Sequence, residues 1–427
     1  VKDIVKRAHD WGHKAIAITD HGVVQAFPDA NHYIESLDKD DPFKIIYGVE
    51  AYLVDDLTEI AQGAKDQTLQ DTYVVFDLET TGFSPIQDKI IEIGAVKVEH
   101  GAITERFSTF VNPKIPIPFK ITDLTGITDD MVMDAEPVEE VLPKFLDFVG
   151  DAVLVAHNAG FDVSFIEQNC RYQEIEKEFI SVDTVALARV LLPTLSKYKL
   201  NVVAKALNIS LENHHRAVDD AQATAEIFVR FVEMLKDREI FTLKELNHFG
   251  SMNPDAIRKL PSHHAVILAK NETGRVNLYR LISMSHLQYF SRMPRIPKSE
   301  FLRYRDGLII GSACEAGELF QAVLNGKSEE QIAKLVNFYD YLEIQPIGNN
   351  RFMIASDRVS NVKSEEDLRD LNRKIVRLGE KFCKPVVATC DVHLLDPEDE
   401  VYRRIIMAGK GFSDADEQAP LYLHTTE

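Results

Sequence analysis

Hydrophobic positions near the start of the chain change from a helical to an extended pattern. Apolar residues between Ile4 and Trp11 recur at the spacing of one helix face, and the apolar run at 15–19 has the length of a short buried strand. A second strand-like run, at 44–54, contains Glu50. A carboxylate inside a buried strand is unfavourable unless it is paired, so we expect Glu50 to have a partner.

The middle of the chain predicts a separate unit. Three strand-like runs with Gly, Pro and Asp turns between them are typical of a meander, at 72–82, 89–101 and 103–113. Helical patterns then alternate with a strand at 152–158, and an amphipathic helix at 219–237 closes the pattern. This alternation predicts an α/β fold.

Two less regular stretches separate this unit from the rest. Residues 55–71 are mostly polar and are interpreted as an exposed linker, while residues 238–261 are mixed in pattern, with a helical alternative, and contain the next boundary. Beyond that boundary, apolar runs separated by helical patterns predict further strands, at 264–270, 307–314, 339–347, 351–356 and 385–393. We therefore expect α/β structure on both sides of the central unit.

Composition and charge restrict the class of protein. The 427 residues, 45% of them hydrophobic, predict two to three globular domains and exclude a mainly disordered chain. No apolar run approaches the ~18 residues of a membrane span, and residues 1–20 are charged where a signal peptide is apolar, so we expect a cytoplasmic protein with no membrane partner. Four cysteines do not make a disulfide framework in so long a chain. The net charge of −20 argues against broad binding to a polyanion, although bound divalent cations reverse the charge locally.

A set of acidic residues stands out in the central unit. Asp77 and Glu79 are two residues apart on a predicted strand, so both side chains project from one face of the sheet and repel each other unless a cation lies between them. Asp162 follows the next predicted strand, and Asp220 lies five residues after His215 at the start of the last helix. Each acid alone is explained as a solvated strand end or a helix cap. Their occurrence together indicates a site.

These motifs resemble those of the DEDDh family of proofreading-type 3′→5′ exonucleases. The match consists of Asp77-x-Glu79-Thr-Thr-Gly, of HNAGFD ending at Asp162, and of His215 followed by Asp220. It implies a ribonuclease H-like domain with a mixed sheet and flanking helices. It also implies two Mg²⁺ or Mn²⁺ ions held by the four carboxylates, with Asp77 bridging both. The implied catalytic residues are His215, as general base, with Asp77 and Glu79.

The chemistry explains why these residue types are needed. Carboxylate oxygens are the ligands that hard divalent cations prefer, and two ions about 3.5–4 Å apart can clamp the attacking water and the leaving 3′ oxygen of a phosphodiester. An imidazole, with an unperturbed pKa of about 6.5, can accept the proton of that water at neutral pH. Asp219 adjoins Asp220, but the spacing from His215 favours Asp220 as the ligand.

Residues beside the acids are expected to contact the terminal nucleotide. In the family that the motifs resemble, the turn after the first acidic strand makes backbone contacts with that nucleotide. The predicted substrate-binding residues are Thr80, Thr81, Gly82, His157, Asn158 and Phe161. Asp183 also has a family counterpart, and a structural role is an equal alternative for it.

A second group of metal-ligand residues lies outside the central unit. Each member falls at or near the end of a predicted strand, where barrel active sites are built, and each alone is more simply a core or loop residue. Together they resemble the PHP (polymerase and histidinol phosphatase) domain, a (β/α)-type barrel, which implies a Zn²⁺ or Mn²⁺ site. The predicted ligands are Asp20, His21, Glu50, His264, Cys314, Asp391 and His393. The His-x-His motif of this family has no counterpart ahead of Asp20, so we expect a partial site at most.

The order of the segments is also informative. Both flanking stretches match PHP segments, so the exonuclease unit is predicted to be inserted in a partial PHP barrel, a layout that resembles the PolC-type alpha chains of bacterial replicative DNA polymerase III. The predicted division is a PHP segment at 1–57, a linker at 58–70, the exonuclease domain at 71–237, a linker at 238–261 and a second PHP segment at 262–427. The chain begins with Val, and no polymerase-type carboxylate set follows His393, so we expect a fragment that does not itself synthesise DNA.

The leading hypothesis is the metal-dependent proofreading exonuclease portion of a replicative polymerase. It would release nucleoside monophosphates from a single-stranded or frayed DNA 3′ end. Its expected partners are the remainder of the polymerase chain, a sliding clamp and other replisome proteins. Two alternatives stay open: a PHP-based structural and interaction platform with little activity of its own, and a PHP phosphoesterase. The last should survive Asp77→Ala and respond to His393→Ala.

Overall fold

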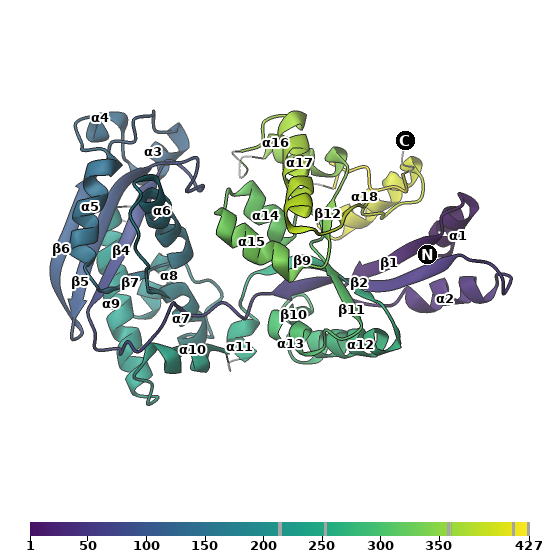
Figure 1. Ribbon diagram of the computed structural model, residues 1–427, viewed down its shortest axis with the longest axis horizontal. Coiled ribbons are helices and arrows are strands. Elements are labelled where there is room, and N and C mark those ends of the chain that lie inside the picture. Colours follow the sequence, from purple (N-terminus) through teal and green to yellow (C-terminus); the bar gives the residue numbers. More distant parts are fainter. Residues whose placement is uncertain (212–215, 252–253, 357–358, 360, 412–414, 425–427) are drawn as a thin grey trace. The chain divides into compact units, whose positions relative to one another are not determined.

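The computed structural model of the chain describes all residues except 212–215, 252–253, 357–358, 360, 412–414 and 425–427. Its contacts divide the chain into two compact units (Figure 1). The central unit is Asp56–Leu260, and the flanking unit combines Val1–Asp55 with Pro261–Glu427. No helix among the described residues has the length and hydropathy of a membrane span. All four cysteines are free thiols.

The central unit is built on a six-stranded sheet in the order β3-β8-β7-β4-β5-β6. Its strands are β3 (Ala61–Gln62), β4 (Tyr73–Thr80), β5 (Ile90–Glu99), β6 (Ala102–Phe110), β7 (Val153–Ala156) and β8 (Ser181–Asp183). The consecutive strands β4, β5 and β6 are antiparallel neighbours, which confirms the predicted meander. Because β7 runs parallel to β4 and to β8, the sheet is mixed, and the unit is α/β as predicted.

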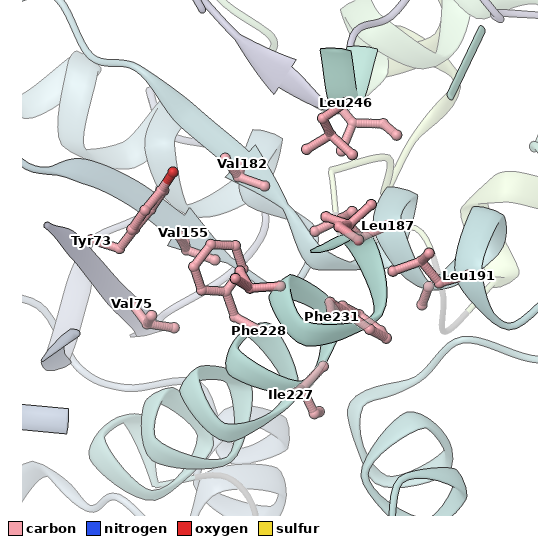
Figure 2. Close-up of a cluster of buried hydrophobic side chains, with 14 of the residues drawn as sticks. Tyr73, Val75, Val155, Val182, Leu187, Leu191, Ile227, Phe228, Phe231 and Leu246 are labelled. Atoms are coloured by element: carbon pink, nitrogen blue, oxygen red, sulfur yellow. The ribbon is translucent and has the colours of Figure 1, made fainter. Parts of the chain in front are cut away.

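Helices cover both faces of this sheet. They are α3 (Phe119–Thr125), α4 (Asp129–Val132), α5 (Val138–Val149), α6 (Ala159–Tyr172), α7 (Thr184–Leu191), α8 (Leu200–Ala206), α9 (Ala217–Lys236), α10 (Leu243–Ser251) and α11 (Pro254–Ile257). Odd positions of β4, such as Val75, pack with α7 and α9, whereas even positions, such as Phe76, pack with α5 and α6. Figure 2 shows the first of these cores, where the ring of Phe228 in α9 lies 4.8 Å from that of Tyr73, centroid to centroid.

The alternation along β4 decides where its acids point. Asp77 and Glu79 share the odd positions of Tyr73 and Val75, so their side chains lie on the α9 face of the sheet. The long helix α9 packs on β4 and β5, and Asp220 belongs to its first turn. A strand and a helix that are far apart in the sequence therefore bring their acids to one side of the sheet.

The first predicted linker is not an exposed linker in the structure, and the second contains helices, in agreement with its helical alternative. The first, at 58–70, contains β3, which pairs with β8, and Leu69, which is buried in the core. The second, at 238–261, contains α10 and α11, and Leu246 of α10 lies in the core that Figure 2 shows. Each stretch contributes only a few core residues within a polar composition, so its hydrophobic pattern was too sparse to indicate burial.

The flanking unit contains a five-stranded sheet and a two-stranded sheet. The strands are β1 (Ala15–His21), β2 (Lys44–Val54), β9 (Ser262–Ala269), β10 (Arg295–Pro297) and β11 (Leu308–Gly311) in the first, and β12 (Leu342–Ile344) and β13 (Val386–Ala388) in the second. In the larger sheet β2 is parallel to β1 and β10 and antiparallel to β9, which is antiparallel to β11. These described strands do not close into a barrel, so the partial (β/α) barrel stays a prediction.

Helices accompany these sheets. They are α1 (Lys2–Asp10), α2 (Phe27–Glu35), α12 (Glu272–Leu287), α13 (Lys298–Arg303), α14 (Glu318–Leu324), α15 (Glu329–Phe338), α16 (Phe352–Ala355), α17 (Glu365–Phe382) and α18 (Glu400–Gly409), with 3₁₀ turns η1 (Ile347–Asn350) and η2 (Pro397–Asp399). The helix α16 corrects the strand predicted at 351–356. A run this short is compatible with both structures, because periodicity cannot be read over one turn. The other predicted strands of this unit are confirmed as β1, β2, β9, β11, β12 and β13, several of them shorter than expected.

Candidate active site and a second ligand cluster

The acids predicted in the central unit meet near the end of β4. Asp77 and Glu79 of β4 and Asp220 of α9 each bring a carboxylate oxygen within 4.8 Å of the others. Asp220 is only 4% exposed, whereas the two residues of β4 are partly exposed, so the cluster is open to solvent on one side. His215, the predicted general base, lies outside the described residues.

Asp162 joins these acids from a different element. It lies in the first turn of α6, directly after β7, and is 3% exposed. Its Oδ1 accepts a hydrogen bond of 3.1 Å from the backbone N–H of Leu78, the residue between Asp77 and Glu79. The structure therefore brings all four predicted acids together, two from β4 and one each from α6 and α9.

Burial and mutual repulsion raise the pKa values in this cluster. Burial first, and then the charges of the other acids, hold the pKa of Asp77 well above its ordinary value. Burial and the charge of Asp220 raise the pKa of Glu79 to about 8. Burial also raises the pKa of Asp162 to about 8, against the opposing hydrogen bond from Leu78. Without a cation Asp77, Glu79 and Asp162 therefore retain protons at neutral pH, as expected of carboxylates that are placed to share a positive ion.

The donor atoms of this cluster fit a hard divalent cation. The close group of described residues offers carboxylate oxygens only, from Asp77, Glu79 and Asp220. Mg²⁺ and Mn²⁺ prefer oxygen ligands, whereas Zn²⁺ sites more often include imidazole or thiolate. The residues present therefore fit a divalent cation of the kind that the DEDDh resemblance implies.

An ion pair between a buried acid and a partly exposed arginine, beside the cluster, was not predicted from the sequence. Glu92 of β5 lies opposite Glu79 in the sheet register and is 1% exposed. Arg216, the residue before α9, places Nη2 2.9 Å from Oε1 of Glu92. An acid within the apolar run at 89–101 was a signal of the same kind as Glu50, because a carboxylate buried in a strand needs a partner. The identity of the partner, 124 residues away in the sequence, had no local signal.

The turn after β4 is held by its own side chains. The hydroxyl of Thr80 donates to the carbonyl of Gly82 at 2.6 Å, and that of Thr81 accepts the N–H of Lys89 at 2.9 Å. A Cβ at Gly82 would lie 2.5 Å from the carboxylate of Asp88, so the turn is tightly packed. Both threonines are buried, and the backbone N–H of Thr81 already donates to the carbonyl of Lys89 at 2.8 Å, so these two residues offer little exposed surface to the predicted contact with a nucleotide. That contact stays a prediction.

His157 has partners that differ from those predicted. Its Nδ1 lies 2.9 Å from Oγ1 of Thr184, and its Nε2 lies 2.8 Å from the carbonyl of Tyr198. Both ring nitrogens have partners inside the protein, which supports a structural role for His157, and its contact with substrate stays a prediction. Asn158 donates its backbone N–H to Oδ1 of Asp183, which also caps α7, so the structural alternative for Asp183 is supported.

Two aromatic rings lie beside the turn. The ring of Phe83 is edge-on to that of Phe161 in α6, with centroids 6.3 Å apart. Phe83 is 68% exposed, which is unusual for so large an apolar side chain. An exposed ring next to acidic residues offers a surface on which a base can stack. Phe83 was not among the residues predicted from the sequence, although its place directly after the predicted substrate turn was an available signal.

The second predicted group of ligands also assembles, within the flanking unit. The register of β1 and β2 places His21 opposite Glu50, and that of β2 and β9 places His264 opposite Tyr52, two residues farther along β2. Nδ1 of His264 lies 2.6 Å from Oε1 of Glu50, and Nε2 of His21 lies 3.8 Å from its Oε2. Burial alone would raise the pKa of Glu50, but the hydrogen bond from His264 and the nearby imidazoles lower it below its ordinary value.

Asp391 and His393 approach the same group from the segment after β13. The ligand atoms of His21, Asp391 and His393 lie within 4.8 Å of one another, as do those of His21, Glu50 and His264. The ring centroids of His21 and His393 are 5.6 Å apart. His21 is therefore common to both groups, and this mixture of imidazole and carboxylate suits Zn²⁺ or Mn²⁺.

Cys314 and Asp20 are the remaining predicted ligands of this cluster, and only Cys314 contacts another member of it. Sγ of Cys314 lies 3.4 Å from Nδ1 of His264, and burial together with nearby carboxylates raises the pKa of its thiol. Asp20 instead accepts the backbone N–H of Ala26 at 3.0 Å and belongs to neither group of ligand atoms. Asp20 is therefore better explained as an acid that stabilises the loop after β1.

Comparisons with known proteins cover both clusters. The Exonuclease family model matches residues 74–228, which include the four acids of the central unit. DNA polymerase III PolC-type from Clostridium perfringens is 59% identical over 99% of this chain, and the protein of that name from Caldanaerobacter subterraneus subsp. tengcongensis is 52% identical over 100% of it. The chain is similar to PolC-type DNA polymerase III along nearly its whole length. It spans 29% and 30% of the lengths of these two relatives.

The match to PolC-type relatives extends across both units, whereas the exonuclease match lies wholly within Asp56–Leu260. The central unit therefore contains the whole stretch that matches the Exonuclease family model. A solved structure described as "Exonuclease X in complex with 5' overhanging duplex DNA" is 27% identical, covers 42% of this chain and 99% of that chain, and has a TM-score of 0.34.

Proposed function

We propose that the central unit is a divalent-metal-dependent 3′→5′ exonuclease that releases nucleoside monophosphates from a DNA 3′ end, as the proofreading portion of a replicative polymerase. The observation that carries this proposal is the meeting of four acids within the region that matches the Exonuclease family. Carboxylates held this close together are unfavourable without a counter-charge. Homology to PolC-type chains supports the polymerase context.

The acids and the predicted base have distinct roles in this proposal. Mg²⁺ or Mn²⁺ would be held by Asp77, Glu79, Asp162 and Asp220, and such ions, when bound, stabilise charge on the attacking and leaving oxygens of a phosphodiester. The N–H of Leu78 orients the carboxylate of Asp162. His215, which directly precedes Arg216 in the sequence, is the proposed acceptor of the proton from the attacking water.

The proposed substrate is a single-stranded or frayed 3′ end. The turn at 80–82 directly follows Glu79 in the sequence, Phe161 directly precedes Asp162, and the ring of Phe83 packs edge-on against that of Phe161, so we assign these groups to hold the last nucleotide. Stacking of a base on an aromatic ring contributes about 1–3 kcal/mol and tolerates every base, as an enzyme that removes any wrong nucleotide requires. A mismatched end unpairs more readily, so the cost of unpairing selects it before any base is recognised.

The proposal extends to the rest of the chain. We assign the flanking unit as a partial PHP domain, with segments 1–57 and 262–427, around a ribonuclease H-like exonuclease domain at 71–237. Support comes from the assembly of His21, Glu50 and His264 within one unit whose two segments enclose the other in the sequence. The remainder of the polymerase chain, a sliding clamp and other replisome proteins are the proposed partners, and the cytoplasm is the proposed location.

Degradation of labelled DNA by the whole 427-residue chain tests the proposal. With Mg²⁺ or Mn²⁺, we expect a 5′-labelled single strand to shorten one nucleotide at a time from its 3′ end, and a chelator to prevent this. A mismatched primer end should be removed faster than a matched one, because less unpairing is needed. Products that shorten from the 5′ end, or cuts within the strand, would contradict the proposal.

The cluster in the flanking unit favours a second candidate, a metal-dependent phosphoesterase site of the PHP type. Glu50 is buried between two imidazoles, so Glu50→Gln should reduce the Zn²⁺ or Mn²⁺ that the purified chain retains. The measurement is metal content by mass spectrometry, in an Asp77→Asn background that removes the central contribution. If metal content and phosphoester hydrolysis do not change in Glu50→Gln and His393→Ala, the flanking unit is a structural platform instead.

A further inference from the structure

The strand β5 contributes nothing to the group formed by Asp77, Glu79 and Asp220, yet it contacts both elements that do. We propose that Glu92 and Arg216 form a positioning clamp, which fixes the first turn of α9 on β5 and thereby sets where Asp220 stands relative to the acids of β4. This inference rests on the proposed function, because it assigns positioning residues to that same site.

The register of the sheet makes β5 the common reference for the two elements. Across the sheet, Asp77 pairs with Gly94, and Glu79 pairs with Glu92. The next residue on this face, Val96, belongs to the core beneath α9. The two β5 residues that face the acids of β4 are therefore the same two that meet the start of α9.

Glu92 holds the start of α9 through several donors. Nη2 of Arg216 lies 2.9 Å from Oε1 of Glu92, and Nε lies 3.3 Å from each of its carboxylate oxygens. The backbone N–H of Ala217, the first residue of α9, donates to Oε2 at 3.2 Å. Arg216 occupies the N-cap position and makes no side-chain cap of its own. Glu92 therefore accepts, from a neighbouring strand, one of the first backbone N–H groups of α9, which have no partner within the helix.

Gly94 allows the helix to approach this closely. A Cβ at this position would lie 2.1 Å from the carbonyl carbon of Ala217 and from the backbone nitrogen of Val218. The N–H of Asp220 donates to the carbonyl of Arg216 at 3.0 Å, which closes the first turn. Asp220 is therefore joined by a backbone hydrogen bond to Arg216, the residue whose side chain Glu92 holds.

Charge explains why the clamp is an ion pair. Glu79 and Glu92 are cross-strand neighbours on one face, where like charges repel. The guanidinium of Arg216 neutralises Glu92, which is buried and would be very unfavourable without a partner. It also lies 5.2 Å from the ring centroid of Phe110, which further fixes its position. A lysine could supply the charge but not the fork of donors.

A purely stabilising ion pair and a clamp differ in what they change. If the pair only stabilises the fold, its removal lowers the unfolding temperature but leaves the cation dependence of the folded enzyme as it was. If it is a clamp, its removal displaces Asp220 and weakens the binding of cations, while the rate at saturating cation falls less. Mutation of a residue that holds a metal ligand in place, without binding the metal itself, typically lowers metal affinity by about 10–100-fold.

The test compares Arg216→Gln, Arg216→Lys and the double variant Glu92→Gln with Arg216→Gln in the whole chain. Two readouts are needed: Mn²⁺ binding by electron paramagnetic resonance, counting only the sites that Asp77→Asn lacks, and the Mg²⁺ concentration that gives half-maximal DNA degradation. We expect Arg216→Gln to raise the dissociation constant for Mn²⁺ and the half-maximal Mg²⁺ concentration about 10–100-fold each. Arg216→Lys should raise these two cation constants less. Arg230→Gln, which breaks the exposed pair of Arg230 with Glu233 on the same helix, is the matched control and should change neither.

The double variant keeps the test decisive if a single variant does not fold. It removes both charges, so no unpaired acid remains buried, and it should unfold at a higher temperature than Arg216→Gln while keeping the raised cation constants. A folded Arg216→Gln or double variant with wild-type cation constants overturns the clamp. A wild-type chain that neither binds Mn²⁺ in the central unit nor degrades DNA overturns the proposed function instead, so the two failures are distinguishable.

Discussion

Replacing Asp77 with asparagine should lower the rate of DNA 3′-end degradation by at least ~10³-fold, on the order of 4 kcal/mol in transition-state free energy. Asp77 lies within the group of acids that also contains Glu79 and Asp220. Asparagine keeps the shape of the side chain, so β4 is preserved, while the charge that would hold a cation is lost. The measurement is the single-turnover rate of nucleotide release by the whole chain at high Mg²⁺.

A neighbouring acid provides the matched control for this experiment. Asp219 is adjacent to Asp220 but is not part of the group of close carboxylates. We therefore expect Asp219→Asn to reduce the rate far less than Asp220→Asn, which should resemble Asp77→Asn. Similar losses in Asp219→Asn and Asp220→Asn would argue that net charge at the start of α9, and not ligation, determines the rate.

Stability without cations separates lost chemistry from unfolding. In the folded chain the pKa of Glu79 and that of Asp162 are each raised to about 8, so folding retains protons that unfolded carboxyls, with pKa values of about 4, release. These two groups should therefore contribute most to the free energy of unfolding below about pH 4 when a chelator is present. Their contribution should be lost as the pH rises through about 8. Asp77→Asn removes one repelling charge and should unfold at pH 8 no more readily than the wild type.

Rapid DNA degradation by this folded variant would contradict the assignment of hydrolysis to the central acids. The cluster around His393 would then be the next candidate for the hydrolytic site.

Much of the central site could be predicted because its signals are local. Two residues of spacing on a strand determine that Asp77 and Glu79 share a face, whatever the sheet packs against. The ends of the strand at 152–158 and of the helix at 219–237 were also readable from periodicity, which placed Asp162 and Asp220 near element ends. The structure adds that these ends converge, and a match to a known family had already implied it.

The parts that could not be predicted depend on contacts between distant residues. The partner of Glu92 is Arg216, and nothing near either residue identifies the other. The ring nitrogens of His157 bond to Thr184 and to the carbonyl of Tyr198, so a residue inside a functional motif has partners within the protein that the motif did not indicate. In the flanking unit the strand register brought His21 and the other ligands together, but the sequence alone did not show that Asp20 is engaged by the backbone of its own loop.

Gly94→Ala should have the second-largest effect, because it acts on the contact that places α9. The added methyl group would lie 2.1 Å from backbone atoms of Ala217 and Val218, far inside the normal separation of about 3.5–4 Å between carbon atoms. Backbone cannot rotate away as a side chain can, so α9 must move off β5. Urea unfolding should show that the free energy of unfolding falls by about 3 kcal/mol, near the upper end for an overpacked core. A displacement of about 1 Å can cost on the order of 100-fold in rate, so nucleotide release should fall by at least that much.

A second glycine separates the clash at Gly94 from the general effect of adding a methyl group. A Cβ at Gly160, in α6, would meet nothing within 4 Å, so Gly160→Ala should leave stability unchanged or raise it slightly, since alanine favours a helix. A Gly94→Ala chain as stable and as active as the wild type would show that α9 tolerates the displacement, and that contact with β5 does not set the position of Asp220. A folded Gly94→Ala chain that degrades DNA only at raised Mg²⁺ would instead show that the distance from α9 to β4, measured through β5, determines how well the acids hold a cation.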